Sequence, residues 1–260
     1  MNRSICAFIF IIAFALALAL PHAHAAKINA ADVDKFAVLQ RGSFKIVIDA
    51  NLKDWALDDQ ILFMGEDTWE ALGGSWKGDD DLSAELKILY DEDSLYFGML
   101  VSDDDYVAKG ANPWDNDGPQ MAIDSSAGKI PAGWPNATTH LYNFSVANGW
   151  LQETGPFMGD AEIEMARDDD NEQTIFEWRM PIDIFADRGF KLEPKVEIAF
   201  AIIINDSDKD AEGQTGWVGW GNNTIVFGKN PEEMKTLVLE AKAMPVEPKD
   251  KLAITWGAIK

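Results

Sequence analysis

Short segments of alternating apolar and polar residues, separated by turns, limit the folds open to this chain more than any other feature. The clearest pair covers residues 85–90 and 94–102, joined by the acidic turn Asp91-Glu92-Asp93, and predicts a β-hairpin. Further short strands are expected at residues 44–49, 120–124, 138–146, 161–166, 174–180, 216–221 and 236–240, and the near-continuous apolar run at residues 196–205 predicts a strand buried on both faces. Roughly ten short strands without a long amphipathic helix predict an all-β fold, a single antiparallel β-sandwich with short helical corners.

The first 25 residues have the features of a signal peptide. Arg3 precedes an almost unbroken apolar run over residues 9–20, and Ala23-His24-Ala25 fits the small-x-small rule for cleavage. The run is too short for a comfortable membrane span, and no second one follows. We therefore expect an exported protein, periplasmic or extracellular, without membrane insertion.

Cleavage after Ala25 would leave 235 of the 260 residues. Residues 26–43 are expected to form a lead-in with a short helical stretch near residues 31–39. Residues 242–260 are expected to form a C-terminal extension. No Ser-, Pro- or Gly-rich linker divides the part between them, which indicates one domain.

The charge balance argues against two classes of partner. The chain has 44 acidic residues and 22 Lys and Arg, a formal net charge of −22. Loss of Arg3 with the signal would change 22 basic residues to 21 and the net charge to −23. Nucleic acids and anionic membranes attract basic surfaces, so neither is expected to bind. Cys6 is the only cysteine and lies in the signal, so the mature chain is expected to have no thiol chemistry.

The stretch 111–124 combines an aromatic residue on a loop with an amide on the strand that follows. Asn112-Pro113 signals a turn, Trp114 follows among Asp and Asn residues, and Gln120 lies on the short strand that leaves this loop. A pyranose offers an apolar face to a ring and hydroxyl groups to an amide that both donates and accepts. Trp114 and Gln120 are therefore candidate sugar-binding residues, although packing of Trp114 over the end of the sandwich is the simpler alternative.

Six short motifs follow one another in a recognisable order. They are Ile48-Asp49-x-Asn51-Leu52-x-Asp54-Trp55, Asp80-Asp81-Leu82-Ser83-Ala84, Leu89-Tyr90-Asp91-x-Asp93-x-Leu95-Tyr96, the 114–124 stretch, Phe200-x-Ile202-x-Ile204-Asn205-Asp206, and Trp220 with Asn230-Pro231. Together they resemble the family 9 carbohydrate-binding modules and the wider group of DOMON-like sandwiches. The resemblance covers residues 44–241 and implies a jelly-roll-like sandwich over that range.

The resemblance also implies a binding mode. Family members hold sugars, characteristically at chain ends, between two Trp rings. Trp114 stands at the position of the first ring, and Gln120 at that of a hydrogen-bonding acid or amide. Asn143 stands near the position of a family Arg that this chain lacks.

The family's second Trp is also missing. The corresponding segment, residues 222–231, contains no Trp. The resemblance implies that Phe227 replaces the ring and that Asn222 or Asn223 supplies an amide. These departures weaken the expectation that the chain binds the same sugar ends.

The sequence supports a catalytic site or a metal site less well than it supports a sugar-binding site. No catalytic residue is predicted, because abundant carboxylates do not define the spaced pair of a glycosidase. His140 is the only histidine after the signal, which excludes a His-rich zinc site. Asp206-x-Asp208-x-Asp210 alternates oxygen ligands as calcium prefers, but Ala211 and Trp217 occupy the EF-hand Gly and Glu positions. No cofactor is expected to be required, and a structural calcium ion is implied by the resemblance alone.

Three functions follow from these observations. The first is a secreted, non-catalytic carbohydrate-binding protein that uses aromatic stacking and amide hydrogen bonds. The second is a polysaccharide-degradation protein with glycoside hydrolase activity or association. The third is a DOMON-like haem b domain, with Met121 and either His140 or Lys229 as axial ligands. Strand alternation places Met121 opposite Gln120, which favours a core position for Met121.

Overall fold

The computed structural model describes residues 27–55, 60–108, 113–125, 139–146, 149–154, 161–183, 190–209, 213–226 and 230–243. Its strands are β1 (Lys27–Asn29), β2 (Lys35–Gln40), β3 (Ile61–Met64), β4 (Glu70–Ala71), β5 (Leu82–Tyr90), β6 (Ser94–Asp103), β7 (Gly118–Asp124), β8 (Thr139–Ser145), β9 (Gly149–Thr154), β10 (Glu162–Asp168), β11 (Gln173–Pro181), β12 (Glu197–Asp206), β13 (Gly216–Trp220) and β14 (Lys235–Ala243).

Helical structure in the described residues is limited to single 3-10 turns. They include η1 (Ala30–Asp32), η2 (Leu52–Asp54), η3 (Glu66–Thr68), η4 (Pro113–Asp115), η6 (Asn222–Thr224) and η7 (Pro231–Glu233), and residues 182–183 have the same conformation. No helix among these residues is long and apolar enough to cross a membrane.

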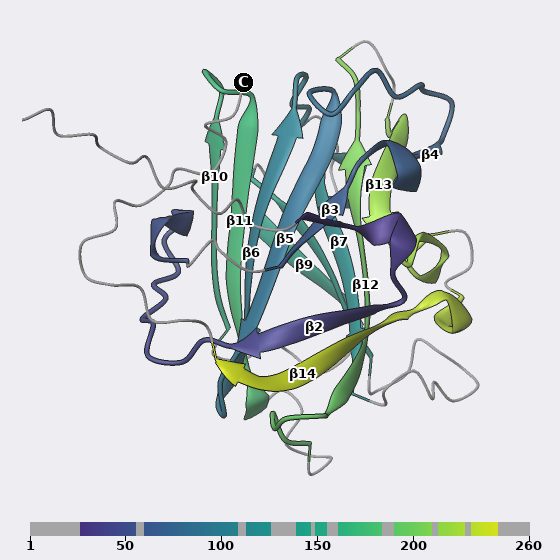
Figure 1. Cartoon of the computed structure of the whole chain (residues 1–260). Helices are drawn as coiled ribbons and strands as arrows, with labels where there is room; N and C mark the ends of the chain where they lie inside the picture. Colours follow the sequence, from purple (N-terminus) through teal and green to yellow (C-terminus); the bar gives the residue numbers. More distant parts are fainter. Residues whose placement is uncertain are drawn as a thin grey trace, which may run out of the picture.

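The strands form one continuous hydrogen-bonded sheet that curls into two layers (Figure 1). The main path runs β10-β11-β6-β5-β2-β14-β12-β7-β8-β9. Rings from the two halves of this path meet in the core. Phe97 on β6 stacks on Phe200 of β12 at 5.8 Å, and Trp178 on β11 stacks on Phe144 of β8 at 5.2 Å. The predicted all-β sandwich is confirmed.

The predicted hairpin is also confirmed, and its turn is held by one carboxylate. β5 and β6 pair antiparallel up to the Tyr90–Leu95 pair. Asp91 Oδ1 accepts hydrogen bonds from the backbone N–H groups of Asp93 and Ser94 at 2.9 and 2.8 Å. An Asp side chain that satisfies the following N–H groups is a common way to fix such a turn.

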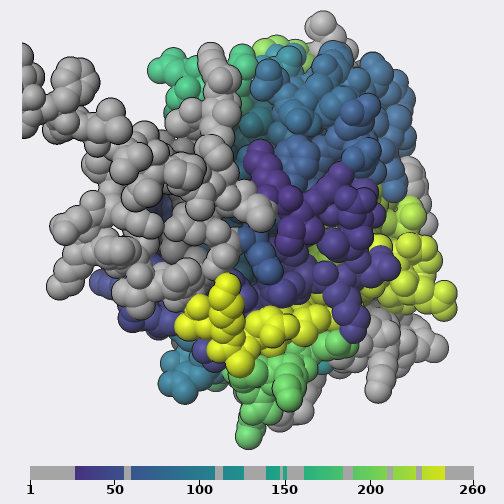
Figure 2. Space-filling model, viewed as in Figure 1, coloured from purple at the N-terminus to yellow at the C-terminus, as the bar shows by residue number. Residues whose placement is uncertain are grey.

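The expected helical stretch near residues 31–39 is wrong. Only η1 is helical there, and β2 follows it as a strand of the sheet. Phe36 and Val38 alternate into the main core, and β2 pairs in parallel with β14 and with the end of β5. Figure 2 shows the first described residues, in purple, beside β14, in yellow, on one face. This segment forms a strand because it pairs with strands that are distant in the sequence, and the local sequence does not reveal that pairing.

Residues 44–49, expected as a strand, have no regular secondary structure and do not join the sheet. Phe44, Ile46 and Ile48 are half-buried, whereas the residues between them are exposed. These three side chains pack with Leu52 and Trp55 on the outer face of the β5–β6 layer, in a cluster that also contains Leu39, Leu89, Tyr96 and Leu100. The period-two pattern therefore reflects packing on a sheet, not pairing within one.

A buried glutamate fastens this outer segment to the sheet. Glu177 on β11 accepts hydrogen bonds from Trp55 Nε1 at 2.7 Å and from the Asp49 backbone N–H at 2.9 Å. Burial raises the pKa of Glu177, and the bond from Trp55 opposes that shift. Gly98 lies beneath the indole, and a Cβ atom there would be 2.9 Å from both Leu52 Cδ2 and Trp55 Cε2.

We therefore expect Gly98→Ala to destabilise the protein. The added methyl group overpacks the contact with Leu52 and Trp55, which should cost about 1–3 kcal/mol of unfolding free energy. Urea denaturation measures this difference. Gly213→Ala is the matched control, because a Cβ atom at Gly213 would meet nothing within 4 Å. Equal stability of the two variants would contradict the close packing of Trp55 on β6.

Candidate functional site

Strand register brings two of the predicted residues together. On β7, Gln120 pairs with Asn143 of β8 on one side and with Ile203 of β12 on the other. Residues directly opposite in adjacent strands point to the same face of a sheet. Ile203 pairs in turn with Gly219 of β13, so the row Asn143–Gln120–Ile203–Gly219 crosses four strands. Neighbouring strands lie about 4.8 Å apart, so the two amides at one end of the row are neighbours.

A third amide, which the sequence analysis did not assign to the site, completes this group. Gln120 Nε2 donates to Asn205 Oδ1 at 3.1 Å. Asn205 Nδ2 is buried and has no hydrogen-bond partner in the part of the chain that the structure describes. A buried donor without a partner typically costs about 1–3 kcal/mol, so such a group often marks a ligand position. In the sequence, Asn205 directly follows a run of apolar residues. This position at the end of a predicted strand could have identified it as a candidate site residue.

The three amides are buried among apolar side chains. Gln120 exposes 6% of its surface, and Asn143 and Asn205 expose none. The neighbouring cluster consists of Ala122, Leu141, Ala201, Ile203, Trp217 and Ile225. The arrangement therefore combines a few directed polar groups with an apolar lining, as small-molecule sites usually do.

Trp114 lies on η4, which packs against β7, β8 and β9. The indole is half-buried. Asn116 and Asp117, two and three positions after Trp114, are almost fully buried, so the loop is anchored shortly after the ring. This position suits a platform beside the strands that carry Gln120 and Asn143. Phe227 falls outside the described residues.

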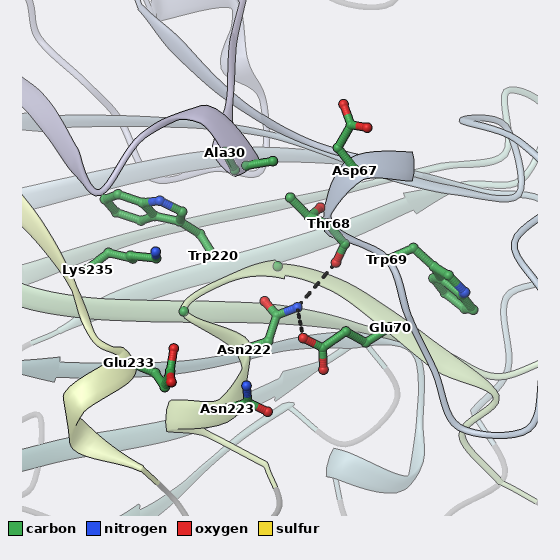
Figure 3. Close-up of a pocket in the computed structure, with 13 residues that line it drawn as sticks. Ala30, Asp67, Thr68, Trp69, Glu70, Trp220, Asn222, Asn223, Glu233 and Lys235 are labelled. Atoms are coloured by element: carbon green, nitrogen blue, oxygen red, sulfur yellow. Dashed lines mark hydrogen bonds between the residues drawn. The ribbon is translucent and has the colours of Figure 1, made fainter.

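Asn222 and Asn223 are not part of this amide group. They lie on η6, directly after β13, on the opposite side of β12 from Gln120. Both line a separate pocket of ≈ 230 Å³ with Trp69, Glu70 and Glu233 among its walls (Figure 3). Asn222 Nδ2 donates to the Thr68 carbonyl at 3.2 Å and to Glu70 Oε1 at 3.1 Å.

Three buried carboxylates meet near the end of the sandwich that carries Trp114. Asp103, Asp117 and Asp206 end β6, precede β7 and end β12, respectively, and expose 3%, 3% and 6%. Burial, followed by the repulsion of nearby carboxylates, raises the pKa of Asp117 well above the usual range. Burial likewise raises the pKa of Asp103, and that of Asp206 reaches about 6 although Thr215 donates to it.

The described residues do not form a metal centre. Among them there is no group of three His, Cys, Asp or Glu side chains placed to hold a metal ion. In the predicted alternating pattern, Asp206 Oδ2 accepts from Thr215 Oγ1 at 2.7 Å, and Asp208 Oδ1 accepts from Lys77 Nζ at 3.0 Å. Asp210 lies outside the described residues. Calcium therefore remains an expectation from the resemblance.

The suggested haem ligands occupy core positions. Met121 is fully buried in the main core, as strand alternation predicted. His140 is also fully buried, and its Nδ1 lies 2.6 Å from the Tyr142 hydroxyl oxygen. Lys229 is outside the described residues. A haem plane at Met121 would have to displace Tyr142, which pairs with it across β7 and β8.

The buried carboxylates predict a pH-dependent stability. Their folded-state pKa values are raised above the unfolded value of about 3.9, so the folded state binds more protons than the unfolded state. Stability should therefore fall as pH rises from about 5 to 8. Asp117→Asn should flatten this slope, because it removes a carboxyl group that must bind a proton when the chain folds and keeps an acceptor for the Val107 N–H. Melting temperatures measured across this pH range in EDTA test the prediction.

Asp170→Asn is the control for this measurement, because Asp170 is an exposed carboxylate in the turn after β10. It removes the same formal charge without changing a buried group. If Asp117→Asn keeps the wild-type slope, the three carboxylates are not coupled to folding in this way.

Comparison with known proteins identifies the family. The family described as carbohydrate family 9 binding domain-like matches residues 65–242. A family 9 carbohydrate-binding module from Caldicellulosiruptor kristjanssonii in complex with cellotriose has a TM-score of 0.63 and 14% identity, over 82% of this chain and 100% of that chain. A module from the same organism in complex with glucose gives 0.59 and 14%, with the same coverage. At such identity these structures show a shared fold alone, and no curated protein matches the chain. Because the family match extends over more than half of its length, the chain belongs to the carbohydrate family 9 binding domain-like family.

Proposed function

We propose that this protein binds carbohydrate without catalysing its hydrolysis, at the face of β7 and β8 beside Trp114. The observation that carries the proposal is the group formed by Gln120, Asn143 and Asn205 on one sheet face. Amides both donate and accept, as sugar hydroxyls do, so such a group can orient a ring. Trp114, on the η4 turn that packs against the same strands, supplies the apolar surface for stacking.

The ligands named for the two similar structures, cellotriose and glucose, support a glucose-based ligand. We therefore propose a short β-linked glucan as the first ligand to test. The burial of Gln120 and Asn143 implies that this face opens when a sugar enters. In this proposal Ile203 and Trp217 line the opened site with apolar surface, which suits the C–H faces of a pyranose more than its hydroxyl groups.

Absence of catalysis is part of the proposal. Retaining and inverting glycosidases need two carboxyl groups on either side of the scissile bond, one of them able to donate a proton. The carboxyl groups with the most strongly raised pKa values, Asp103 and Asp117, are buried and hydrogen-bonded to backbone N–H groups. Their location suits a structural role. Association with a separate glycoside hydrolase is consistent with a binding role.

Trp114→Ala tests the proposed site. Loss of the ring should weaken cellotriose binding by roughly tenfold to a hundredfold, since a stacked ring contributes about 1–3 kcal/mol. Isothermal titration calorimetry measures the affinity, and the melting temperature should stay close to that of the wild type. A large loss of stability with unchanged affinity would make Trp114 a structural residue. The titration is repeated in EDTA, which shows whether a cation contributes.

Trp76→Ala is the matched control for the loss of an indole. Trp76 is also half-buried in a loop, and its ring N–H donates to the Leu82 carbonyl at 3.1 Å. It lies outside the β7–β8 face, so its removal should leave the sugar affinity unchanged. Equal effects of the two substitutions on affinity would argue against a specific platform at Trp114.

We also propose that the protein is exported. The support is the positive residue Arg3, the apolar run at residues 9–20 and the small residues Ala23 and Ala25. N-terminal sequencing of the protein purified from its native cells should begin at Ala26. An intact N-terminus recovered with the membrane fraction would indicate an anchor instead.

A further inference from the structure

One edge of the sheet is open at β10 in the part of the chain that the structure describes. β10 pairs along its length with β11, from the Glu162–Arg179 pair to the Asp168–Gln173 pair, and with no other described strand. In an antiparallel pair, alternate residues direct their N–H and C=O groups away from the partner strand. Every second residue of β10 therefore presents backbone groups to which another strand could bind.

β10 has few of the features that protect such an edge. Edge strands are commonly short, interrupted by a bulge, or marked by Lys and Pro. β10 has seven residues, pairs without a register shift, and contains neither Lys nor Pro. Its side chains Ile163 and Met165 pack against the main core but are only half-buried. A further strand beside β10 would complete the cover of these two side chains.

The sequence after β14 contains a segment with the pattern of such a strand. Residues 244–260 lie outside the described residues. Within them, residues 252–259, here called the apolar segment, read LAITWGAI. Leu252, Ile254 and Trp256 alternate with mostly small residues, which is typical of a strand with one buried face. Residues 244–251 form a linker that contains two prolines, and proline favours extended backbone on its N-terminal side.

This linker is long enough to bring the apolar segment to β10. A row of paired residues runs across the sheet from β14 to β11 through Ala243, Gln40, Tyr90, Leu95 and Met180. The end of β14 and the start of β10 therefore lie at the same end of the sheet (Figure 1). Ala243 is six strand spacings from a strand added beside β10, roughly 29 Å at about 4.8 Å each. Nine extended residues from Ala243 to Leu252 span about 30 Å, and the curl of the sheet shortens the direct path.

Charge favours the apolar segment over a second copy of β10 as the partner. The outward side chains of β10 include three exposed carboxylates, those of Glu162, Glu164 and Asp168. Two copies of β10 would bring these carboxylates together, and like charges on neighbouring strands are destabilising. The apolar segment has no charged residue, and Lys251 precedes it. It can therefore pair with an acidic edge without repulsion.

We propose that the apolar segment adds a strand to β10 and closes this edge within one chain. Because the linker arrives at the start of β10, the added strand would run parallel to β10. Ile254 and Trp256 would pack against the main core beside the two half-buried side chains of β10, and Thr255 would face solvent. This contact lies beyond the family match, which ends at residue 242, and does not involve the face proposed to bind sugar.

Disulfide formation tests this arrangement. Cys6 is the only cysteine, so the chain without residues 1–25 contains none. In the proposed register Thr255 is the neighbour of Glu164, within the Cα separation of about 4.4–6.8 Å that a disulfide requires. Mild oxidation of the double variant Glu164→Cys/Thr255→Cys should form this bond within one chain, and peptide mass mapping identifies it. Bonds that link two chains would overturn the intramolecular pairing.

The matched control is the double variant Glu240→Cys/Thr255→Cys. Glu240 is also exposed on a strand, and it lies near the end of β14, where the linker begins. A short tether gives a high effective concentration, so an undocked segment would react faster with this position than with β10. Docking should reverse the order and make the Glu164 pair at least about tenfold faster. A control pair that reacts as fast or faster, or a Glu164 pair that does not react, would contradict the proposal.

Hydrogen exchange provides a second test without added cysteines. Ile254→Asn would place an amide against the main core, whereas Thr255→Asn, its matched control, would place the same group in solvent. Amide exchange in β10, followed by mass spectrometry, should be at least about tenfold faster in Ile254→Asn than in the control, because the outward N–H groups of β10 lose their partners. Equal exchange in the two variants would show that the segment does not protect this edge.

Discussion

The contact between rings from opposite halves of the sheet is the interaction on which the rest of the structure depends. Trp178 stacks on Phe97 at 4.8 Å within one layer and on Phe144 at 5.2 Å across the core. Phe97 also stacks on Phe200. Large rings bury much apolar surface, and their stacking adds a geometric preference to that burial. These contacts fix the spacing of the layers and therefore which side chains face outward.

The two outer faces of the sandwich differ because different residues point outward from the strands of each layer. On the β5–β6–β11 face, Gly98 provides a depression that Trp55 fills, and Glu177 binds its indole N–H. The chain thus covers this face with its own segment. On the β7–β8–β12 face, the outward residues include Gln120, Asn143 and Asn205. Burial of these polar groups lowers the stability of the fold, and the large core offsets this cost. Functional sites often contain residues that are unfavourable for stability in this way.

The acidic character of the protein also has two parts. Some carboxylates in the described residues lie in loops beside a lysine; Asp105 with Lys209 and Asp208 with Lys77 are examples. Asp103 and Asp117 are instead buried, which raises the pKa of both, and the charge of Asp103 raises the pKa of Asp117 further. Amino-acid composition accounts for the surface carboxylates, because net charge affects the solubility of a protein and its choice of partners. It says nothing about the second group, which exists only because the end of β6 and the start of β7 lie close together.

The sequence by itself determined the fold class and the family. The alternation along β5 and β8, the apolar runs of β6 and β12 and turn residues such as Asp91 are all local patterns, which a single sequence shows. The order of six short motifs was enough for the family resemblance, which the match over residues 65–242 confirms. Trp114 and Gln120 were recognisable as candidates because a loop aromatic residue followed by a strand amide is also a local pattern.

The tertiary structure decided what depends on contacts between distant residues. It made a strand of β2 through parallel pairing with β14, and it kept residues 44–49 out of the sheet because they pack on its outer face. It joined Asn205 to Gln120, 85 positions apart, and placed Asn222 beside Glu70 on the other side of β12. Register across strands sets such neighbours, and register is a property of the whole sheet that local alternation does not specify.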